Sequence, residues 1–209
     1  MAAESSLAVQ RAPRRFAAIG EEIRIEILRK AIHLLIAIVP SLARIDLRLT
    51  LGLLSFGILV YAICEAYRID GKRIPVISRV TALAARRRDA GKFVLGPVTL
   101  GLGAMLSLLL YPSPAAAVAI YALAFGDGFS SLVGKLFGSI RLPFTGGKSL
   151  EGSLTCLAAV FLAALAVSGR PLPALAVAAV AMVVEAAPLK DFDNIVLPVL
   201  TGAFAVLVI

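Results

Sequence analysis

Seven long apolar runs are the feature of this sequence that most restricts its fold. They cover residues 31–43, 49–67, 94–111, 115–134, 153–168, 172–187 and 194–209. A helix needs about 20 predominantly apolar residues to cross a bilayer. Hydrophobic residues make up 60% of the chain and charged residues 16%, against roughly 45–50% and about 25% in soluble domains. We therefore predict an all-α, polytopic integral membrane helix bundle of about seven transmembrane helices, forming a single domain over residues 1–209.

The basic residues alternate between the predicted loops. All but three of the 21 Lys and Arg residues fall in the N-terminal segment or in the loops at 68–93, 135–151 and 188–193. The exceptions are Arg44, Arg48 and Arg170. Because cytoplasmic loops are enriched in Lys and Arg, we predict a cytoplasmic N-terminus. The net charge of +8 then reflects membrane topology and requires no nucleic-acid partner.

The segment 69–93 is predicted to be a basic cytoplasmic loop. Its apolar residues Val76, Ile77, Val80 and Leu83 would share one face of a helix, and most of its arginines lie elsewhere. This pattern is typical of an amphipathic helix on an anionic leaflet. A solvated linker that carries topological charge explains it equally well.

The cysteines and the N-terminus exclude several classes of protein. Cys64 and Cys156 both lie in apolar runs, which favours buried small residues over a disulfide or a metal pair. One histidine and no CxxC motif exclude a structural zinc site. No signal-peptide pattern precedes the first apolar run, so we expect that run to be a retained helix.

Ionisable residues inside membrane spans are candidates for function because they are costly there. Just before the first run, Glu26 can pair with Arg29 or Lys30 at helical spacing, and His33 lies about one turn further into the membrane. In the fourth run, Asp127 lies among residues that form a smooth ridge every four positions: Gly126, Ser130, Gly134 and Gly138. The ridge alone indicates close helix packing, but a buried carboxylate at Asp127 needs a Lys, an Arg or a metal ion beside it.

A third polar group, "KSLEGS" at 148–153, lies between two apolar runs. It is not a P-loop, because Leu142 occupies the position of the first glycine of that motif. A lysine and a hydroxyl near a helix N-terminus nevertheless suit phosphate oxygens. The structural alternative makes Ser149 the N-cap and Glu151 a first-turn acid, but it leaves Lys148 unexplained.

A fourth group surrounds the turn before the last run. Glu185 lies at the end of the sixth run, and Asp191, Asp193 and Asn194 follow it. Oxygen donors of this kind suit Mg²⁺, although a polar turn with a helix cap explains the turn residues as well. The four groups are all predicted at one edge of the membrane, which indicates a site for a nucleotide, a metal ion and a substrate that resides in the lipid.

These four groups, in this order, resemble the family of dolichol kinases, phytol kinases and CTP-dependent diacylglycerol kinases, over most of the chain. The family is distantly similar to phosphatidate cytidylyltransferases. The residues that match its motifs are Arg29, Lys30, His33, Gly126, Asp127, Ser130, Gly134, Gly138, Lys148, Ser149, Glu151, Gly152, Glu185, Asp193, Asn194 and Pro198.

The resemblance implies a CTP-dependent kinase that phosphorylates a membrane-embedded polyisoprenoid alcohol at the cytoplasmic face. The residues expected to be catalytic are Asp127, Lys148, Glu151, Glu185 and His33, with Glu151, Glu185 or His33 accepting the hydroxyl proton. The residues expected to bind the nucleotide are Arg29, Lys30, Gly126, Gly134, Lys135, Lys148, Ser149, Gly152 and Asn194. The expected ligands of Mg²⁺, or of another divalent cation, are Asp127, Asp193 and Glu185.

Other functions stay open at this stage. A cytidylyltransferase would use the same site to transfer CMP, and a diacylglycerol kinase would use a different lipid acceptor. A transporter would also place ionisable residues in the membrane, but an inverted repeat and midplane polar residues from both halves are absent from the sequence. The sequence identifies neither the lipid alcohol nor the oligomeric state, and the glycine-rich fourth run would pack within one protomer or between two.

Overall fold

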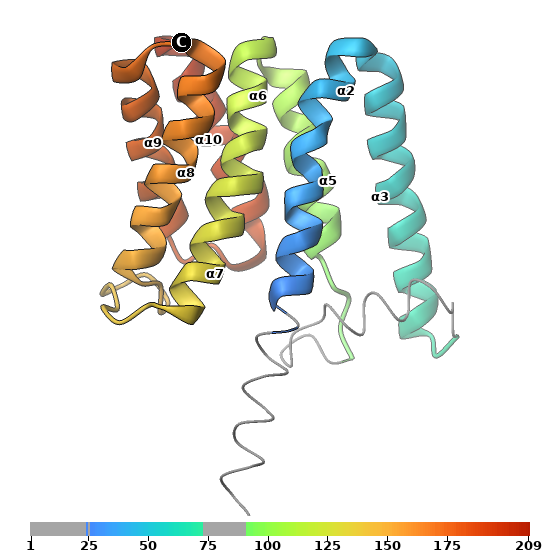
Figure 1. Ribbon diagram of the computed structural model, residues 1–209. Helices are drawn as coiled ribbons and strands as arrows, with labels where there is room; N and C mark the ends of the chain where they lie inside the picture. The colour runs from blue at the N-terminus through green and yellow to red at the C-terminus, as the bar shows by residue number, and fades with distance from the viewer. Residues whose placement is uncertain (1–23, 25, 73–90) are drawn as a thin grey trace, which may run out of the picture.

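The computed structural model describes residue 24 and the ranges 26–72 and 91–209, and the helices of these ranges form an upright bundle (Figure 1). Residues 26–35 are helical. The elements that follow are η1 (Ile36–Ile38), α2 (Val39–Ile45), α3 (Leu47–Ile69), α5 (Gly96–Leu110), α6 (Ser113–Tyr121), η3 (Ala122–Asp127), α7 (Gly128–Leu136), α8 (Leu150–Ser168), α9 (Pro171–Ala186), η4 (Lys190–Phe192) and α10 (Asp193–Val208). Within these ranges the one β feature is an isolated bridge between Arg141 and Ser149. The predicted all-α membrane bundle is confirmed.

The number of membrane spans stays a prediction. Four stretches are long and apolar enough to cross a membrane, namely Leu47–Ile69, Ser113–Leu136, Leu150–Ser168 and Lys190–Val208. Two further apolar helices, α5 and α9, have 15 and 16 residues. At 1.5 Å per residue they are about 22 and 24 Å long, which is less than the roughly 30 Å of a bilayer core. The first apolar run is also helical, but η1 interrupts it.

Small residues allow the helices at the centre of the bundle to approach closely. The main core cluster consists mostly of alanine and valine from α6, α8, α9 and α10, together with Cys156. Large apolar side chains such as Phe56, Leu162 and Leu207 point outward and are exposed. This distribution is the one expected when lipid surrounds the bundle, because close packing of small residues then holds the helices together.

Gly103 shows how closely two of these helices meet. A Cβ atom at this position of α5 would lie 2.0 Å from the carbonyl oxygen of Asn194 in α10. Pro198 lacks the N–H that would otherwise bond to that carbonyl. Glycine is therefore required at position 103, and the contact brings the N-terminus of α10 against α5.

The two ends of the bundle differ in charge. Figure 1 shows the start of the helix at 26–35, the end of α3, the 137–149 loop and the turn between α9 and α10 at one end of the bundle. The other turns and the C-terminus lie at the opposite end. The first end, called the basic end below, carries Arg29, Lys135, Lys148 and Lys190, whereas Arg44, Arg48 and Arg170 lie at the other end. The predicted alternation of loops is therefore present in the fold. Residues 73–90, which carry the predicted amphipathic segment, lie outside the described residues.

The orientation can be tested with single cysteines in a Cys64→Ala/Cys156→Ala background. Ser139 and Ser113 are both exposed, and they lie at opposite ends of the bundle. In intact cells we expect a membrane-impermeant maleimide to label Ser113→Cys at once and Ser139→Cys only after permeabilisation. Labelling of both positions from the same side would contradict the bundle, and the reverse pattern would contradict a cytoplasmic basic end.

Candidate active site

A polar cavity of about 410 Å³ opens at the basic end. It lies between α7, the 141–149 loop, the start of α8 and the turn from α9 to α10, with the side chains of Glu26 and Arg29 closing one side. Five cationic side chains line it: Arg29, Lys135, Arg141, Lys148 and Lys190. A concave site of this size and charge is suited to a polyanion such as a nucleotide phosphate chain.

Asp127 lies at the base of this cavity in a buried network. It ends η3, a π-helical turn, and such turns are frequent at functional sites. Its side chain binds the ammonium of Lys30 and lies 3.1 Å from His33 Nε2. Asp127 and Lys30 are only 3% and 1% exposed, so the two charges are matched to each other away from water.

Asn194 extends the network to two more helices. Its Oδ1 lies 2.9 Å from His33 Nε2, and its Nδ2 donates to Thr99 Oγ1 at 2.9 Å and to the carbonyl of Gly96 at 3.3 Å. Because both neighbours of His33 Nε2 are acceptors, that nitrogen carries a hydrogen and acts as a donor. In this arrangement His33 does not accept a proton through Nε2.

Lys148 and Glu185 form a second pair in the wall of the polar cavity. The ammonium of Lys148 lies 2.8 Å from Glu185 Oε1 and also contacts the Glu185 carbonyl oxygen. Ser130 Oγ lies 3.2 Å from the same Oε1. Glu185 Oε2 and Ser153 Oγ are buried without a hydrogen-bond partner in the described part of the chain. Buried polar atoms are normally paired, so these two are available to a ligand in the cavity.

Glu26 holds two of the cations in place. Its carboxylate binds Arg29 at 2.6 Å and Lys135 at 2.7 Å, so of the two partners predicted for it, Arg29 is the one it contacts. Although burial raises the pKa of Glu26, the charges of Arg29 and Lys135 outweigh that effect, and its pKa lies below the usual value. Glu26 is therefore ionised at neutral pH, and it keeps both cations at the cavity wall.

Ser149 and Glu151, at the start of α8, both have structural roles. Ser149 caps α8 by accepting a hydrogen bond from Gly152 N at 3.1 Å. The carboxylate of Glu151 accepts hydrogen bonds from the backbone N–H groups of Ser139 at 2.8 Å and Ile140 at 3.2 Å. Glu151 lines neither this cavity nor the narrower one described below, so the structure does not bring it to the predicted catalytic position.

The three predicted metal ligands, Asp127, Glu185 and Asp193, all line the polar cavity. Among the residues described, no group of three or more His, Cys, Asp or Glu side chains is placed to hold a metal ion. Mg²⁺ is usually held by one or two carboxylates together with substrate phosphates. The unpartnered Glu185 Oε2 fits that kind of site, and the ligand assignment stays a prediction.

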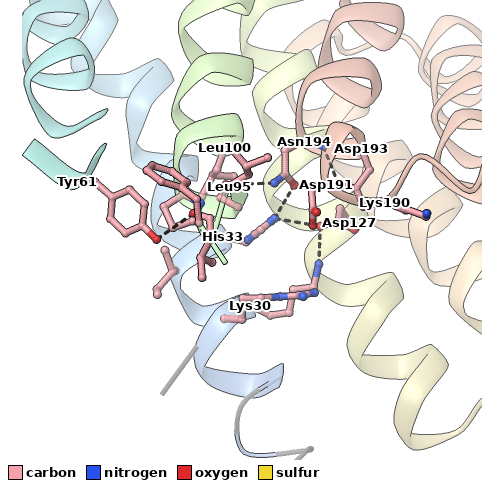
Figure 2. Close-up of a pocket in the computed structure, with 16 residues that line it drawn as sticks. Lys30, His33, Tyr61, Leu95, Leu100, Asp127, Lys190, Asp191, Asp193 and Asn194 are labelled. Atoms are coloured by element: carbon pink, nitrogen blue, oxygen red, sulfur yellow. Dashed lines mark hydrogen bonds and ion pairs between the residues drawn. The ribbon is translucent and has the colours of Figure 1, made fainter. Parts of the chain in front are cut away.

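A narrower cavity of about 80 Å³ lies on the other side of Asp127. Figure 2 shows Tyr61 at one end of it and Asp127 and Asp193 at the other, with His33 between them. Its apolar lining comes from residues 26–35, α3, α5 and the segment 93–95 before α5, and includes Ile32, Phe93, Leu95 and Leu100. The two cavities share Arg29, Asp127, Lys190 and Asp193.

The structure thus brings most of the predicted site residues together. The polar cavity contains Arg29, Asp127, Gly134, Lys135, Lys148, Ser149, Gly152, Glu185 and Asp193. The narrow cavity adds Lys30, His33 and Asn194. Gly126 lines neither cavity, since a Cβ atom there would meet Val160 at 2.9 Å and Cys156 at 3.2 Å. Its role is close helix packing, and the binding and catalytic roles of the other residues stay predictions.

Some residues at or near the site were not predicted from the sequence. Glu65, fully buried in α3, accepts hydrogen bonds from Arg68 and from Val94 N, all at 2.7–2.8 Å. The signal was available, because Glu65 and Arg68 form an i,i+3 pair near the end of an apolar run. Tyr61 and Lys190 gave no signal, since their approach to the site depends on the packing of distant helices.

Several curated proteins are similar to this chain. A probable chloroplastic phytol kinase 1 of Glycine max is 30% identical over 160 residues, which cover 68% of the chain and 53% of the relative. A chloroplastic farnesol kinase of Arabidopsis thaliana is 34% identical over 84 residues, which cover 39% of the chain and 27% of the relative. The chain spans about half the length of the first of these relatives.

Similarity also extends to an uncharacterized protein of Methanocaldococcus jannaschii, which is 27% identical over 135 residues, 62% of the chain and 65% of that protein. No family model matches the chain. No solved structure matches it.

The buried ion pair can be tested by unfolding in detergent micelles. Lys30→Met leaves the Asp127 carboxylate buried without its cation, and we expect the free energy of unfolding to fall by about 3–5 kcal/mol. Lys30→Met/Asp127→Asn removes both charges and should recover most of that loss.

The matched control is Lys135→Met, since the Lys135 side chain is 47% exposed and Glu26 keeps Arg29 as a partner. Its expected effect is about 1 kcal/mol or less. A double variant no more stable than Lys30→Met would contradict the charge pairing.

Proposed function

Because the chain is a relative of the phytol and farnesol kinases, we propose that it is a phosphotransferase with a prenyl alcohol as acceptor. Its phosphoryl donor is a nucleoside triphosphate, which we take to be CTP. The acceptor is an isoprenoid chain that ends in a hydroxyl, as in phytol, farnesol or a longer polyprenol. The observation that carries this proposal is the polar cavity, where cations and carboxylates line one concave surface.

The triphosphate is assigned to the polar cavity. Its volume of about 410 Å³ lies in the range of small-molecule sites. Lys148 enters it from the loop before α8, and Arg29 and Lys135 are held there by Glu26. The cavity opens at the basic end, so we place the active site at the cytoplasmic face.

Phosphoryl transfer depends mainly on neutralising charge and on aligning the reacting atoms. The alcohol oxygen forms a bond to the terminal phosphorus, the bond from that phosphorus to the bridging oxygen breaks, and the nucleoside diphosphate leaves. Lys148 is placed to neutralise the phosphate oxygens that gain charge as this happens. A Mg²⁺ ion held by carboxylates among Asp127, Glu185 and Asp193 would add positive charge at the same phosphates when bound.

The hydroxyl proton needs an acceptor, and the geometry favours Glu185 among the three predicted candidates. His33 Nε2 acts as a donor to Asp127 and Asn194, and Glu151 binds backbone N–H groups outside both cavities. Glu185 uses Oε1 for Lys148 and Ser130, while Oε2 has no partner among the residues described. That oxygen accepts either the proton or the cation.

The activity is tested with purified protein, terminally labelled CTP and a panel of farnesol, phytol, a polyprenol and diacylglycerol. We expect labelled lipid phosphate with the prenyl alcohols. Lys148→Ala and Asp127→Asn should each lower kcat/KM by about 10²–10³-fold, the usual effect of removing one electrostatic contact to the transition state.

Lys72→Ala is the matched control, since Lys72 lies at the basic end over the ring of Tyr67 and lines neither cavity. It should retain normal turnover. Release of pyrophosphate with a CDP-lipid product would instead identify a cytidylyltransferase. Absence of lipid phosphate with CTP, ATP, GTP and UTP would refute the proposal, and near-normal turnover of either site variant would refute the role given to that residue.

A further inference from the structure

The narrow cavity differs from the polar cavity in size and lining. Its volume of about 80 Å³ is a fifth of that of the polar cavity, so it does not admit a nucleotide. Its walls are apolar on the side of Tyr61, Leu95 and Leu100, and polar where Asp127 and Asn194 lie (Figure 2). A slim molecule with a hydrocarbon body and one polar end matches this division.

The polar end of the narrow cavity is also part of the polar cavity. Asp127 and Asp193 line both. A hydroxyl that reaches these residues through the narrow cavity therefore arrives beside the space assigned to the phosphates. The hydroxyl would then approach from the narrow cavity and the nucleoside diphosphate would leave into the polar cavity, an arrangement compatible with attacking and leaving oxygens roughly in line.

The apolar wall is held in place by three side chains of α3, called the clamp below, of which Glu65 is fully buried. Tyr61 Oη donates to the carbonyl of Val94 at 3.0 Å, and Glu65 Oε1 accepts from Val94 N at 2.8 Å. Arg68, bound to Glu65 through two nitrogens, donates to the carbonyl of Lys92 at 2.8 Å. Three side chains thus fix the backbone of residues 92–94, and Phe93, Val94 and Leu95 line the narrow cavity.

The surface beside the narrow cavity suits a substrate whose hydrocarbon chain continues into the lipid. Leu95 lines the narrow cavity and is 42% exposed. A hydrocarbon chain that leaves the cavity past Leu95 stays in contact with apolar surface, so its burial in the membrane is not interrupted.

We propose that the narrow cavity between residues 26–35, α3 and α5 binds the hydroxyl end of the prenyl alcohol acceptor. The inference rests on the proposed function and adds a location to it. Leu95 and Leu100 contact the first carbons of the acceptor, Asn194 and Asp127 lie at its hydroxyl, and the clamp of Tyr61, Glu65 and Arg68 positions the wall.

The first test fills the narrow cavity with a larger side chain and measures KM for each substrate. Leu95→Trp places an indole in the narrow cavity. The control is Leu109→Trp, near the other end of α5, where the side chain is exposed and lines neither cavity. We expect Leu95→Trp to raise KM for farnesol at least tenfold and to leave KM for CTP within twofold. The control should match the unmodified protein, and a Leu95→Trp effect confined to CTP would overturn the inference.

Photo-crosslinking gives a second test that does not depend on turnover. The probe is farnesol with a diazirine near its hydroxyl, added to the full chain in detergent, and the labelled peptides are identified by mass spectrometry. We expect labels at residues 61 and 93–97 that excess farnesol displaces and that Leu95→Trp weakens.

The two proposals fail in different ways. If the protein phosphorylates farnesol but the displaceable label lies elsewhere, the cavity assignment is wrong and the kinase proposal survives. If the label lies at residues 61 and 93–97 but no nucleotide yields lipid phosphate, the binding site is supported and the kinase proposal is wrong.

Discussion

The rest of the site depends on the neutralisation of one buried carboxylate, Asp127. An ionised side chain within an apolar bundle is stable only when a charge of opposite sign and hydrogen-bond donors surround it. Lys30 supplies the charge, and His33 supplies a donor that Asn194 also shares. The network joins residues 26–35, η3, α10 and α5, so one electrostatic requirement fixes the relative positions of four segments that are distant in the sequence.

The same network separates two cavities of different character. Lys135, Arg141 and Lys148 line only the polar cavity, whereas the apolar wall of Tyr61, Leu95 and Leu100 belongs only to the narrow one. A reaction between a polyanion and a lipid needs such a boundary, because the two substrates require opposite environments. The polar residues lie at the basic end because lysine and arginine near the membrane edge can reach water, whereas the centre of the bundle contains small apolar residues.

Much of this could be predicted from the sequence. The apolar runs predicted the helices, because a segment buried in lipid must be long and apolar and must form its backbone hydrogen bonds internally. The positions of Lys and Arg predicted which loops share one end of the bundle. Four motifs gave the family resemblance, which the names of the phytol and farnesol kinase relatives confirm. The number of spans was less certain, since α5 has 15 residues and α9 has 16, fewer than the roughly 20 that a membrane span needs. For Glu151 and Gly126 the sequence could not decide between a structural role and a role in the site, because residues of both kinds can share the same motif.

The sequence by itself determined the helical class, the grouping of charge at one end and the identity of the candidate residues, since each follows from local composition and spacing. Only the tertiary structure decided which residues pair. Lys30 rather than Arg29 meets Asp127, Lys148 meets Glu185, and Tyr61 and Glu65 in α3 hold the wall of a second cavity. These contacts join residues as many as 97 positions apart. They depend on how closely the helices approach and on the rotation of each helix about its axis. Small residues such as Gly103 allow a close approach, but the local sequence does not specify which helices meet or which faces they present.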